Sequence, residues 1–216
     1  PAGLASSKLF KEGFFTIQQE ASMKTVEVLD PKENTRILDL CAAPGTKTSY
    51  LAEYTKNTAK IVANDLAKSK NKLILENIER LGLKNISLTN YDASSFVEEF
   101  KDEFDYVLVD APCSGLGVVG RKPEIRYNRS KETIVRLANL QREILESALK
   151  YVKKGGFLVY STCTIGPLEN RDNFKFLKDK ENLELVDING EDFIEYKSFE
   201  TMTDGFFISK FRKKYD

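Results

Sequence analysis

A short apolar run passes into a tight turn and then into a helix at Arg36-Ile37-Leu38-Asp39-Leu40-Cys41-Ala42-Ala43-Pro44-Gly45-Thr46-Lys47. The apolar run predicts a strand over residues 36–40, and the small residues after it predict a turn that opens into a helix ending near Tyr54. A turn of this kind presents backbone N–H groups and a helix N-terminus to a ligand. It holds one glycine, where the dinucleotide-binding fingerprint has three.

Apolar runs alternate with charged, helix-favouring segments along the rest of the chain. Further strands are predicted at residues 60–65, 85–89, 104–110, 157–162, 183–186 and 205–211, the last of them antiparallel. Helices are predicted at 68–81 and 131–152, and Gly155-Gly156 is expected to end the longer one. This alternation predicts the α/β class, with one doubly wound, mostly parallel sheet covered by helices on both faces.

The organisation of the chain is expected to be simple. Residues 1–25 are predicted to form a lead-in segment that packs on a single domain over residues 26–216. The lead-in offers apolar side chains for that packing, namely Phe10, Phe14, Phe15 and Ile17.

Composition excludes several classes of function. The 33 basic and 33 acidic side chains cancel, so an anionic partner must be held by a local patch. Histidine is absent, which excludes Ser-His-Asp triads, Cys-His dyads and histidine metal ligands within this chain, and no metal is expected. The three cysteines form no CxxC pair and fit a reducing cytoplasm. No apolar stretch approaches the ~20 residues of a membrane span, and no secretory signal is visible at the start.

The three thiols each follow a predicted strand. Cys41 follows the first strand, Cys113 lies three residues past Asp110, and Cys163 follows the strand at 157–162. In doubly wound sheets, ligands bind outside the carboxyl ends of the strands, so all three thiols are predicted to lie at the ligand-binding edge. A cysteine is often only a small buried hydrophobe, and that alternative stays open here, most of all for Cys41.

Two acidic residues suit an adenosine-bearing cofactor. Asp65 ends the second strand 20 residues beyond Gly45, where an acceptor for ribose hydroxyls is expected. Asp92 follows the third strand and can accept a hydrogen bond from an adenine amino group. Either carboxylate can instead be a helix cap or a loop residue. This pattern does not separate NAD from S-adenosylmethionine.

Two later motifs distinguish S-adenosylmethionine from NAD as the cofactor. They are Asp110-Ala111-Pro112-Cys113-Ser114-Gly115 and Ser161-Thr162-Cys163-Thr164. At these residues the sequence resembles the RsmB/Sun (Fmu) family of RNA cytosine-5 methyltransferases. Residues 40–48 match that family's cofactor loop, residues 14–22 its lead-in, and residues 203–207 its last motif. The segment 121–126 is most similar to the bacterial ribosomal-RNA type, RsmB.

The resemblance implies a Rossmann-like class I methyltransferase fold with S-adenosylmethionine as cofactor. It implies a cofactor site made of Cys41, Ala42, Ala43, Pro44, Gly45, Thr46, Lys47, Asp65, Asp92 and Asp110. It assigns the attack on carbon 6 of cytosine to Cys163, the release of the covalent adduct to Cys113, and a hydrogen bond to ring nitrogen 3 to Asp110.

The Cys163 thiolate needs stabilisation without histidine. We expect it from Lys47, from the cofactor's sulfonium charge, and from a helix N-terminus with Pro167 in its first turn. Lys47 can instead be a solvated residue of its own helix.

RNA is the expected partner, with small-subunit ribosomal RNA favoured over transfer RNA, and the protein is expected to act as a monomer away from membranes. The loop 114–130 carries the local basic and aromatic patch that RNA binding needs, although it can also be a plain solvated loop. Its candidate RNA-binding residues are Arg121, Lys122, Arg126, Tyr127 and Arg129.

Three other functions remain open. In a DNA cytosine-5 methyltransferase the nucleophile would be Cys113, the thiol of the Pro-Cys pair. A noncatalytic RNA-binding factor could use the same fold, but it would have no chemical need for both thiols. A dehydrogenase would need the glycine fingerprint that the turn at Gly45 lacks.

Overall fold

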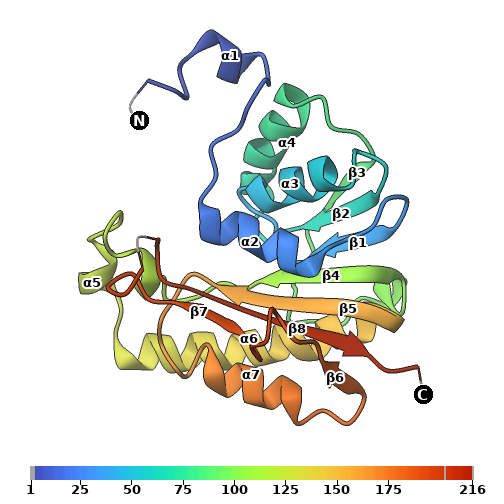
Figure 1. Ribbon diagram of the computed structural model, residues 1–216, viewed down its shortest axis with the longest axis vertical. Helices are drawn as coiled ribbons and strands as arrows, with labels where there is room; N and C mark the ends of the chain where they lie inside the picture. The colour runs from blue at the N-terminus through green and yellow to red at the C-terminus, as the bar shows by residue number, and fades with distance from the viewer. Residues whose placement is uncertain (1–2, 202, 216) are drawn as a thin grey trace.

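The computed structural model describes residues 3–201 and 203–215 of the chain. Within these residues a single eight-stranded sheet has the order β3-β2-β1-β4-β5-β8-β6, and β7 also pairs with β8 (Figure 1). Its strands are β1 (Arg36–Asp39), β2 (Lys60–Asn64), β3 (Ile86–Thr89), β4 (Phe104–Asp110), β5 (Val152–Thr162), β6 (Leu183–Leu185), β7 (Ile194–Tyr196) and β8 (Phe206–Lys213). Strands β1 to β5 pair in parallel and β8 is antiparallel to β5, which confirms the predicted fold class.

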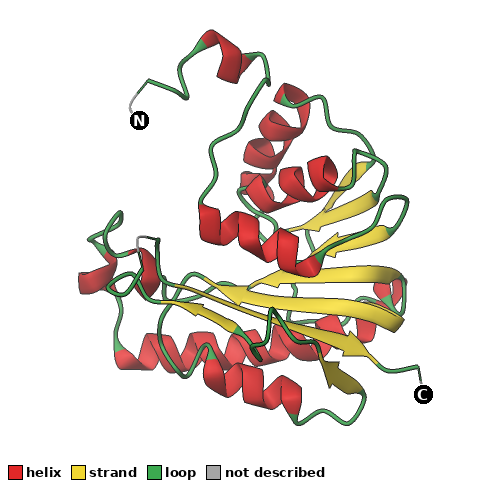
Figure 2. Ribbon diagram, viewed as in Figure 1, coloured by secondary structure: helices red, strands yellow, loops and turns green. Residues whose placement is uncertain are grey.

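Helices cover both faces of the sheet (Figure 2). Their bounds are α1 (Lys8–Lys11), α2 (Glu20–Leu29), α3 (Thr46–Tyr54), α4 (Asn71–Arg80), α5 (Ile125–Asn128), α6 (Lys131–Tyr151) and α7 (Arg171–Lys178), with short 3₁₀ helices η1 (Lys68–Lys70), η2 (Glu98–Phe100) and η3 (Leu116–Val118). Helices α2, α3 and α4 lie on one side of the sheet, and α6 and α7 lie on the other.

The central strand β4 shows why the sheet is apolar throughout. Successive side chains of a strand point to opposite faces. Leu108 therefore packs in the core under α2 and α3, while Val107 and Val109 pack in the core under α6 and α7. Because both faces are covered, residues 106–109 of the strand form a continuous apolar run, and the bounds of the strand are predicted correctly from sequence.

The prediction that Gly155-Gly156 ends the long helix is wrong. Helix α6 ends at Tyr151, and β5 begins at once with the buried Val152, which pairs with Phe104. The two glycines lie inside the strand, in an irregular stretch where the register with β4 shifts, and Gly155 has a φ of +80°. A glycine pair marks a strand bulge as readily as a helix end, so the sequence alone does not decide between them.

The lead-in packs differently from the expectation. Arg80 of α4 donates hydrogen bonds to the carbonyls of Phe10 and Phe15 and stacks over the Phe10 ring. Phe14 and Ile17, expected to pack on the domain, are exposed instead. Helix α2 crosses residue 25 with Ala21 in the core, so we propose the start of α2 as a better boundary between lead-in and core.

Candidate active site

The carboxyl ends of β1, β4 and β5 lie side by side because these strands are neighbours in the sheet. The loops that follow them contain Cys41, Cys113 and Cys163 respectively, all three half-buried and free of disulfides. The thiols therefore lie at the same edge of the sheet, as the sequence predicts.

Two of these thiols are in contact. The Sγ atoms of Cys113 and Cys163 lie 3.2 Å apart. The pKa of Cys163 lies below its ordinary value, chiefly because the Cys113 thiol hydrogen-bonds to it and further because Lys47 is near, whereas burial acts the other way. The same contact, together with burial, holds the pKa of Cys113 well above its ordinary value. Of the two thiols, Cys163 therefore ionises more readily, and Cys113 is placed to donate a hydrogen bond to it. The sequence placed both residues here but did not indicate this contact.

Lys47 reaches from the first turn of α3 to the end of β4. Its Nζ lies 2.7 Å from Oδ2 of Asp110, whose Oδ1 accepts a hydrogen bond of 2.8 Å from the Ser161 hydroxyl. The Lys47 side chain is largely buried and also lies over the Phe206 ring, so it is not a solvated residue of its helix. The ion pair fixes a carboxylate and an ammonium beside the two thiols.

The expected helix N-terminus near Cys163 is not at the predicted place. Helix α7 begins at Arg171 with Asn170 as its N-cap, and Pro167 lies in the turn before it. Within this turn, the side chains of Glu169 and Asn170 bond to the two catalytic loops.

The turn after β1 packs closely against α4 and is tied to the end of β2. Gly45, with a φ of +97°, is the N-cap of α3, and a Cβ there would come within 3.0 Å of Ile74 in α4. The Ala43 N–H donates to Oδ2 of Asp65 at 3.1 Å, which ties the turn to the end of β2. The other residues predicted in this turn, Cys41, Ala42, Pro44 and Thr46, therefore lie next to Asp65 or at the start of α3.

The acidic residues at this edge fit the adenosine-bearing cofactor. Burial raises the pKa of Asp39 to about 7, against the hydrogen bond from Thr48, and its Oδ1 has no partner among the described residues. Such an orphaned acceptor beside the Asp65 and Asp110 carboxylates suits a ligand that carries hydroxyl and amino donors. Burial, with the Asp39 carboxyl next in weight, raises the pKa of Cys41 well above its ordinary value, so Cys41 is a neutral lining group.

Asp92 stands apart from the others. It is exposed, and its Oδ1 accepts hydrogen bonds from the backbone and the hydroxyl of Ser94, which lower its pKa. This is the loop geometry that the sequence left open, and a role for Asp92 toward the adenine ring stays a prediction.

The candidate RNA-binding residues divide into two kinds. Arg121 forms an ion pair of 2.8 Å with Asp204, and the Arg129 Nε donates to the Ser114 carbonyl at 2.8 Å. These two arginines fasten the loop to its surroundings. Lys122, Arg126 and Tyr127 are exposed, with 84 % of the tyrosine accessible, so they form the basic and aromatic surface.

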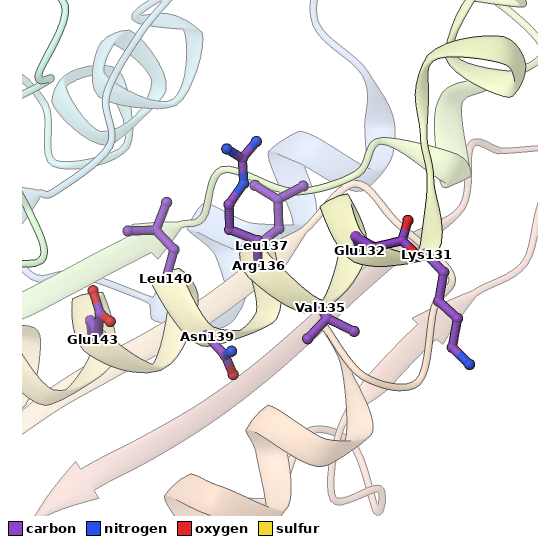
Figure 3. A pocket seen from close by; sticks show the side chains of 8 residues that line it. All are labelled: Lys131, Glu132, Val135, Arg136, Leu137, Asn139, Leu140 and Glu143. Carbon is purple, nitrogen blue, oxygen red and sulfur yellow. The ribbon is translucent and has the colours of Figure 1, made fainter.

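A groove runs along the amino-terminal half of α6, and none of the residues that line it is a cysteine (Figure 3). It is lined by Lys131, Glu132, Val135, Arg136, Leu137, Asn139, Leu140 and Glu143. Among the described residues, no group of three or more Cys, Asp or Glu side chains could hold a metal ion. No helix in the described ranges has the length and apolarity to cross a membrane.

Sequence reasoning missed the polar side chains behind the thiols. Glu169 and Gln141 are fully buried and hydrogen-bonded to each other. Gln141 lies in the buried stripe of α6 between Ala138 and Leu145, where an amide interrupts an otherwise apolar pattern. That interruption is the signal that could have found them, because a buried amide needs a polar partner.

Comparison with known proteins agrees with this geometry. A family model described as 16S rRNA methyltransferase RsmB/F matches residues 26–212. The chain is 41 % identical to the probable ribosomal RNA small subunit methyltransferase B of Bacillus subtilis, over 98 % of this chain and 50 % of that protein. It is 38 % identical to the tRNA (cytosine(72)-C(5))-methyltransferase of Pyrococcus horikoshii, over 99 % of this chain and 56 % of that protein.

A solved structure, NSun6 from Pyrococcus horikoshii with SFG, superposes with a TM-score of 0.86 at 36 % identity. The match covers 99 % of this chain and 56 % of that one. The chain thus spans about half the length of these relatives. A family model over most of the chain and high identity across nearly its full length lead to one conclusion: the chain belongs to the RsmB/F family of RNA cytosine-5 methyltransferases.

Proposed function

We propose that this chain transfers a methyl group from S-adenosylmethionine to carbon 5 of a cytosine in RNA, through a transient bond between Cys163 and the base. The observation that carries the proposal is the 3.2 Å contact between the Cys113 and Cys163 sulfurs, with the Lys47–Asp110 ion pair beside it. A thiolate, a thiol and a held carboxylate are the three groups that the chemistry requires.

Attack by the Cys163 thiolate forms a bond from sulfur to carbon 6 of cytosine. The electrons of the 5,6 double bond then make carbon 5 nucleophilic, as in covalent catalysis generally. Asp110, held by Lys47 and Ser161, accepts a hydrogen bond from ring nitrogen 3 as that atom takes up a proton. S-adenosylmethionine, when bound, supplies the electrophilic methyl group.

In release, a solvent base takes the proton from carbon 5 and the electron pair left behind re-forms the 5,6 double bond. The sulfur–carbon bond breaks with its electron pair returning to the Cys163 sulfur, which a thiol donor stabilises. We assign assistance in this step to Cys113, whose sulfur touches that of Cys163. The hydrogen bond with Cys163, together with burial, raises the pKa of Cys113, while the same contact lowers the pKa of Cys163, so Cys163 is the better candidate for the attacking group. In the DNA-methyltransferase alternative, Cys113 would have to attack instead.

Residues of the turn after β1, with Asp65 at the end of β2, would hold the cofactor. Backbone N–H groups at the start of α3 and carboxylates at the strand ends are the donors and acceptors that its carboxylate, amino and hydroxyl groups need. Asp92 is the proposed partner of the adenine ring.

We propose ribosomal RNA of the small subunit as the substrate, with transfer RNA as the alternative. The Bacillus relative bears a ribosomal RNA name and the Pyrococcus relative a tRNA name, so relatives support both. Lys122, Arg126 and Tyr127 would contact the RNA, because they form an exposed basic and aromatic surface on a protein without net charge. A reducing cytoplasm would keep the thiols free.

The test is methyl transfer from labelled S-adenosylmethionine to ribosomal RNA and to transfer RNA, with modified cytosines mapped by bisulfite sequencing. The proposal predicts label at carbon 5 of cytosine with the wild-type chain and none with Cys163→Ala. Label elsewhere in the RNA, or full activity without Cys163, would refute it. A wild-type chain that binds RNA without transferring label would instead support a noncatalytic binding factor.

A further inference from the structure

A buried carboxylate behind the thiols has no part in the chemistry above. Glu169, in the turn between β5 and α7, is 0 % exposed. Within the described residues, no lysine or arginine forms an ion pair with it. Burial of an unpaired carboxylate costs free energy unless hydrogen bonds satisfy its oxygens. The hydrogen-bond partners of Glu169 therefore indicate its role.

The Glu169 carboxylate holds the loop that contains Cys113. Its Oε1 accepts hydrogen bonds from the Ser114 N–H at 2.8 Å and from Nε2 of Gln141 at 3.0 Å. Its Oε2 accepts a hydrogen bond of 2.5 Å from the Ser114 hydroxyl. The same Gln141 amide also donates to the Pro112 carbonyl at 2.9 Å. The residues on both sides of Cys113 are therefore fixed by one cluster of side chains.

The neighbouring Asn170 holds the loop that contains Cys163. Its Nδ2 donates to the Thr164 carbonyl at 2.9 Å, and its Oδ1 accepts a hydrogen bond of 2.6 Å from the Thr162 hydroxyl. The Thr164 hydroxyl lies 2.8 Å from that of Ser114, which joins the two loops directly. The consecutive residues Glu169 and Asn170 thus hold the two catalytic loops by hydrogen bonds, Glu169 the Cys113 loop and Asn170 the Cys163 loop.

We propose that Glu169 is a positioning residue that sets the contact between the Cys113 and Cys163 sulfurs and acts on the reaction through Cys113. The proposal rests on the function proposed above. Loss of the carboxylate frees Ser114 and lets the Cys113 loop move away from Cys163. The hydrogen bond that favours the Cys163 thiolate is then weakened, and the thiol that assists release is displaced.

The experiment measures the pH dependence of iodoacetamide alkylation at Cys163 by peptide mass spectrometry, on the 216-residue chain without RNA or cofactor. Glu169→Gln keeps the shape of the side chain but presents an NH₂ group to donors. We expect a higher apparent pKa for Cys163 and alkylation about tenfold slower at pH 7, which corresponds to roughly one pKa unit. Leu177→Ala in α7, a buried residue of the apolar core, is the control for general destabilisation and should leave the profile unchanged.

A double-mutant cycle identifies the route of the effect. Cys113→Ala, which removes the hydrogen-bond donor, should alone also raise the apparent pKa of Cys163, and adding Glu169→Gln to it should change nothing further. If Glu169→Gln fails to fold, as judged by circular dichroism, Ser114→Ala removes the hydroxyl bonds to Oε2 of Glu169 and to the Thr164 hydroxyl, and it should shift the profile in the same direction.

Three results would overturn the proposal: a wild-type profile in a folded Glu169→Gln or Ser114→Ala variant, an undiminished shift in the Cys113→Ala background, or an equal shift in Leu177→Ala. Because the measurement needs neither RNA nor cofactor, it tests the positioning role of Glu169 separately from methyl transfer. A chain that shows the predicted shift but methylates no RNA would refute the proposed function and support the positioning role.

Discussion

At the scale of single residues, the activation of Cys163 depends chiefly on the Cys113 hydrogen bond and further on charges from α3 and β4. The Lys47 ammonium favours the thiolate, while Asp110 opposes it. Lys47→Met keeps the length of the side chain and removes the charge, so we predict a higher apparent pKa for Cys163 and slower alkylation at neutral pH. Lys24→Met, which removes a surface lysine of α2, is the matched control. Identical titration curves for Lys47→Met and wild type would contradict this assignment.

The raised pKa of Asp39 leads to a prediction about how the free energy of unfolding depends on pH. Its pKa of about 7 in the folded chain, against 3.8 in the unfolded one, means that the folded state binds the proton more tightly. Its contribution to the free energy of unfolding is therefore lost as pH rises between those two values. Asp39→Asn can still accept the Thr48 hydrogen bond and removes this dependence. Relative to wild type, the variant should gain about 3 kcal/mol between pH 5 and pH 8 in urea unfolding. An equal difference at both pH values would contradict the prediction.

The residues that the sequence reveals are those with reactive chemistry. Cys113, Cys163 and Asp110 stand in short motifs at strand ends, and strand order brings such ends together. Glu169 is not recognisable in this way, because an acidic residue near a helix start ordinarily reads as a helix-terminal charge. Its role depends on Ser114, 55 positions away in the chain, and no local pattern reports an interaction of that kind.

At the scale of elements, β4 and β5 show what apolar patterns can and cannot predict. The bounds of β4 are predicted correctly from an apolar segment that only Asp105 interrupts before it ends at Asp110. Strand β5 begins at Val152, five residues before the predicted start at residue 157. Val152 is buried within the strand, and this burial outweighs the tendency of Gly155 and Gly156 to end a helix. The three-residue β7 and the four-residue α5 are too short to give a periodic signal, and tertiary packing decides them.

The loop that contains α5 carries the prediction about RNA. The double variant Lys122→Ala with Arg126→Ala should weaken RNA binding, because two phosphates of the RNA are then no longer neutralised. The slope of log affinity against log salt should fall by about 1.4, at ~0.7 for each such phosphate on a single strand. Filter binding at several salt concentrations measures the slope. Lys72→Ala with Lys84→Ala removes two exposed lysines elsewhere and should leave it unchanged. An equal decrease in both double variants would mean that the loop is only a solvated surface.

At the scale of the whole molecule, the sheet serves to bring distant parts of the chain to one edge. The parallel order from β3 to β5 places the cofactor turn, the carboxylates and both thiols in adjacent loops, while α6 and α7 support those loops from one face. This arrangement follows from alternation of strands and helices, which is why the fold class is predictable from sequence although the exact bounds are not.

The central claim is that Cys163 bonds to the base and that Cys113 assists its release. The most direct measurement is a denaturing gel of the chain incubated with RNA and S-adenosylmethionine. The account predicts that Cys113→Ser accumulates a covalent protein–RNA adduct and that Cys113→Ser combined with Cys163→Ser forms none. An adduct that persists without Cys163, or one that Cys163→Ser alone accumulates through Cys113, would contradict it.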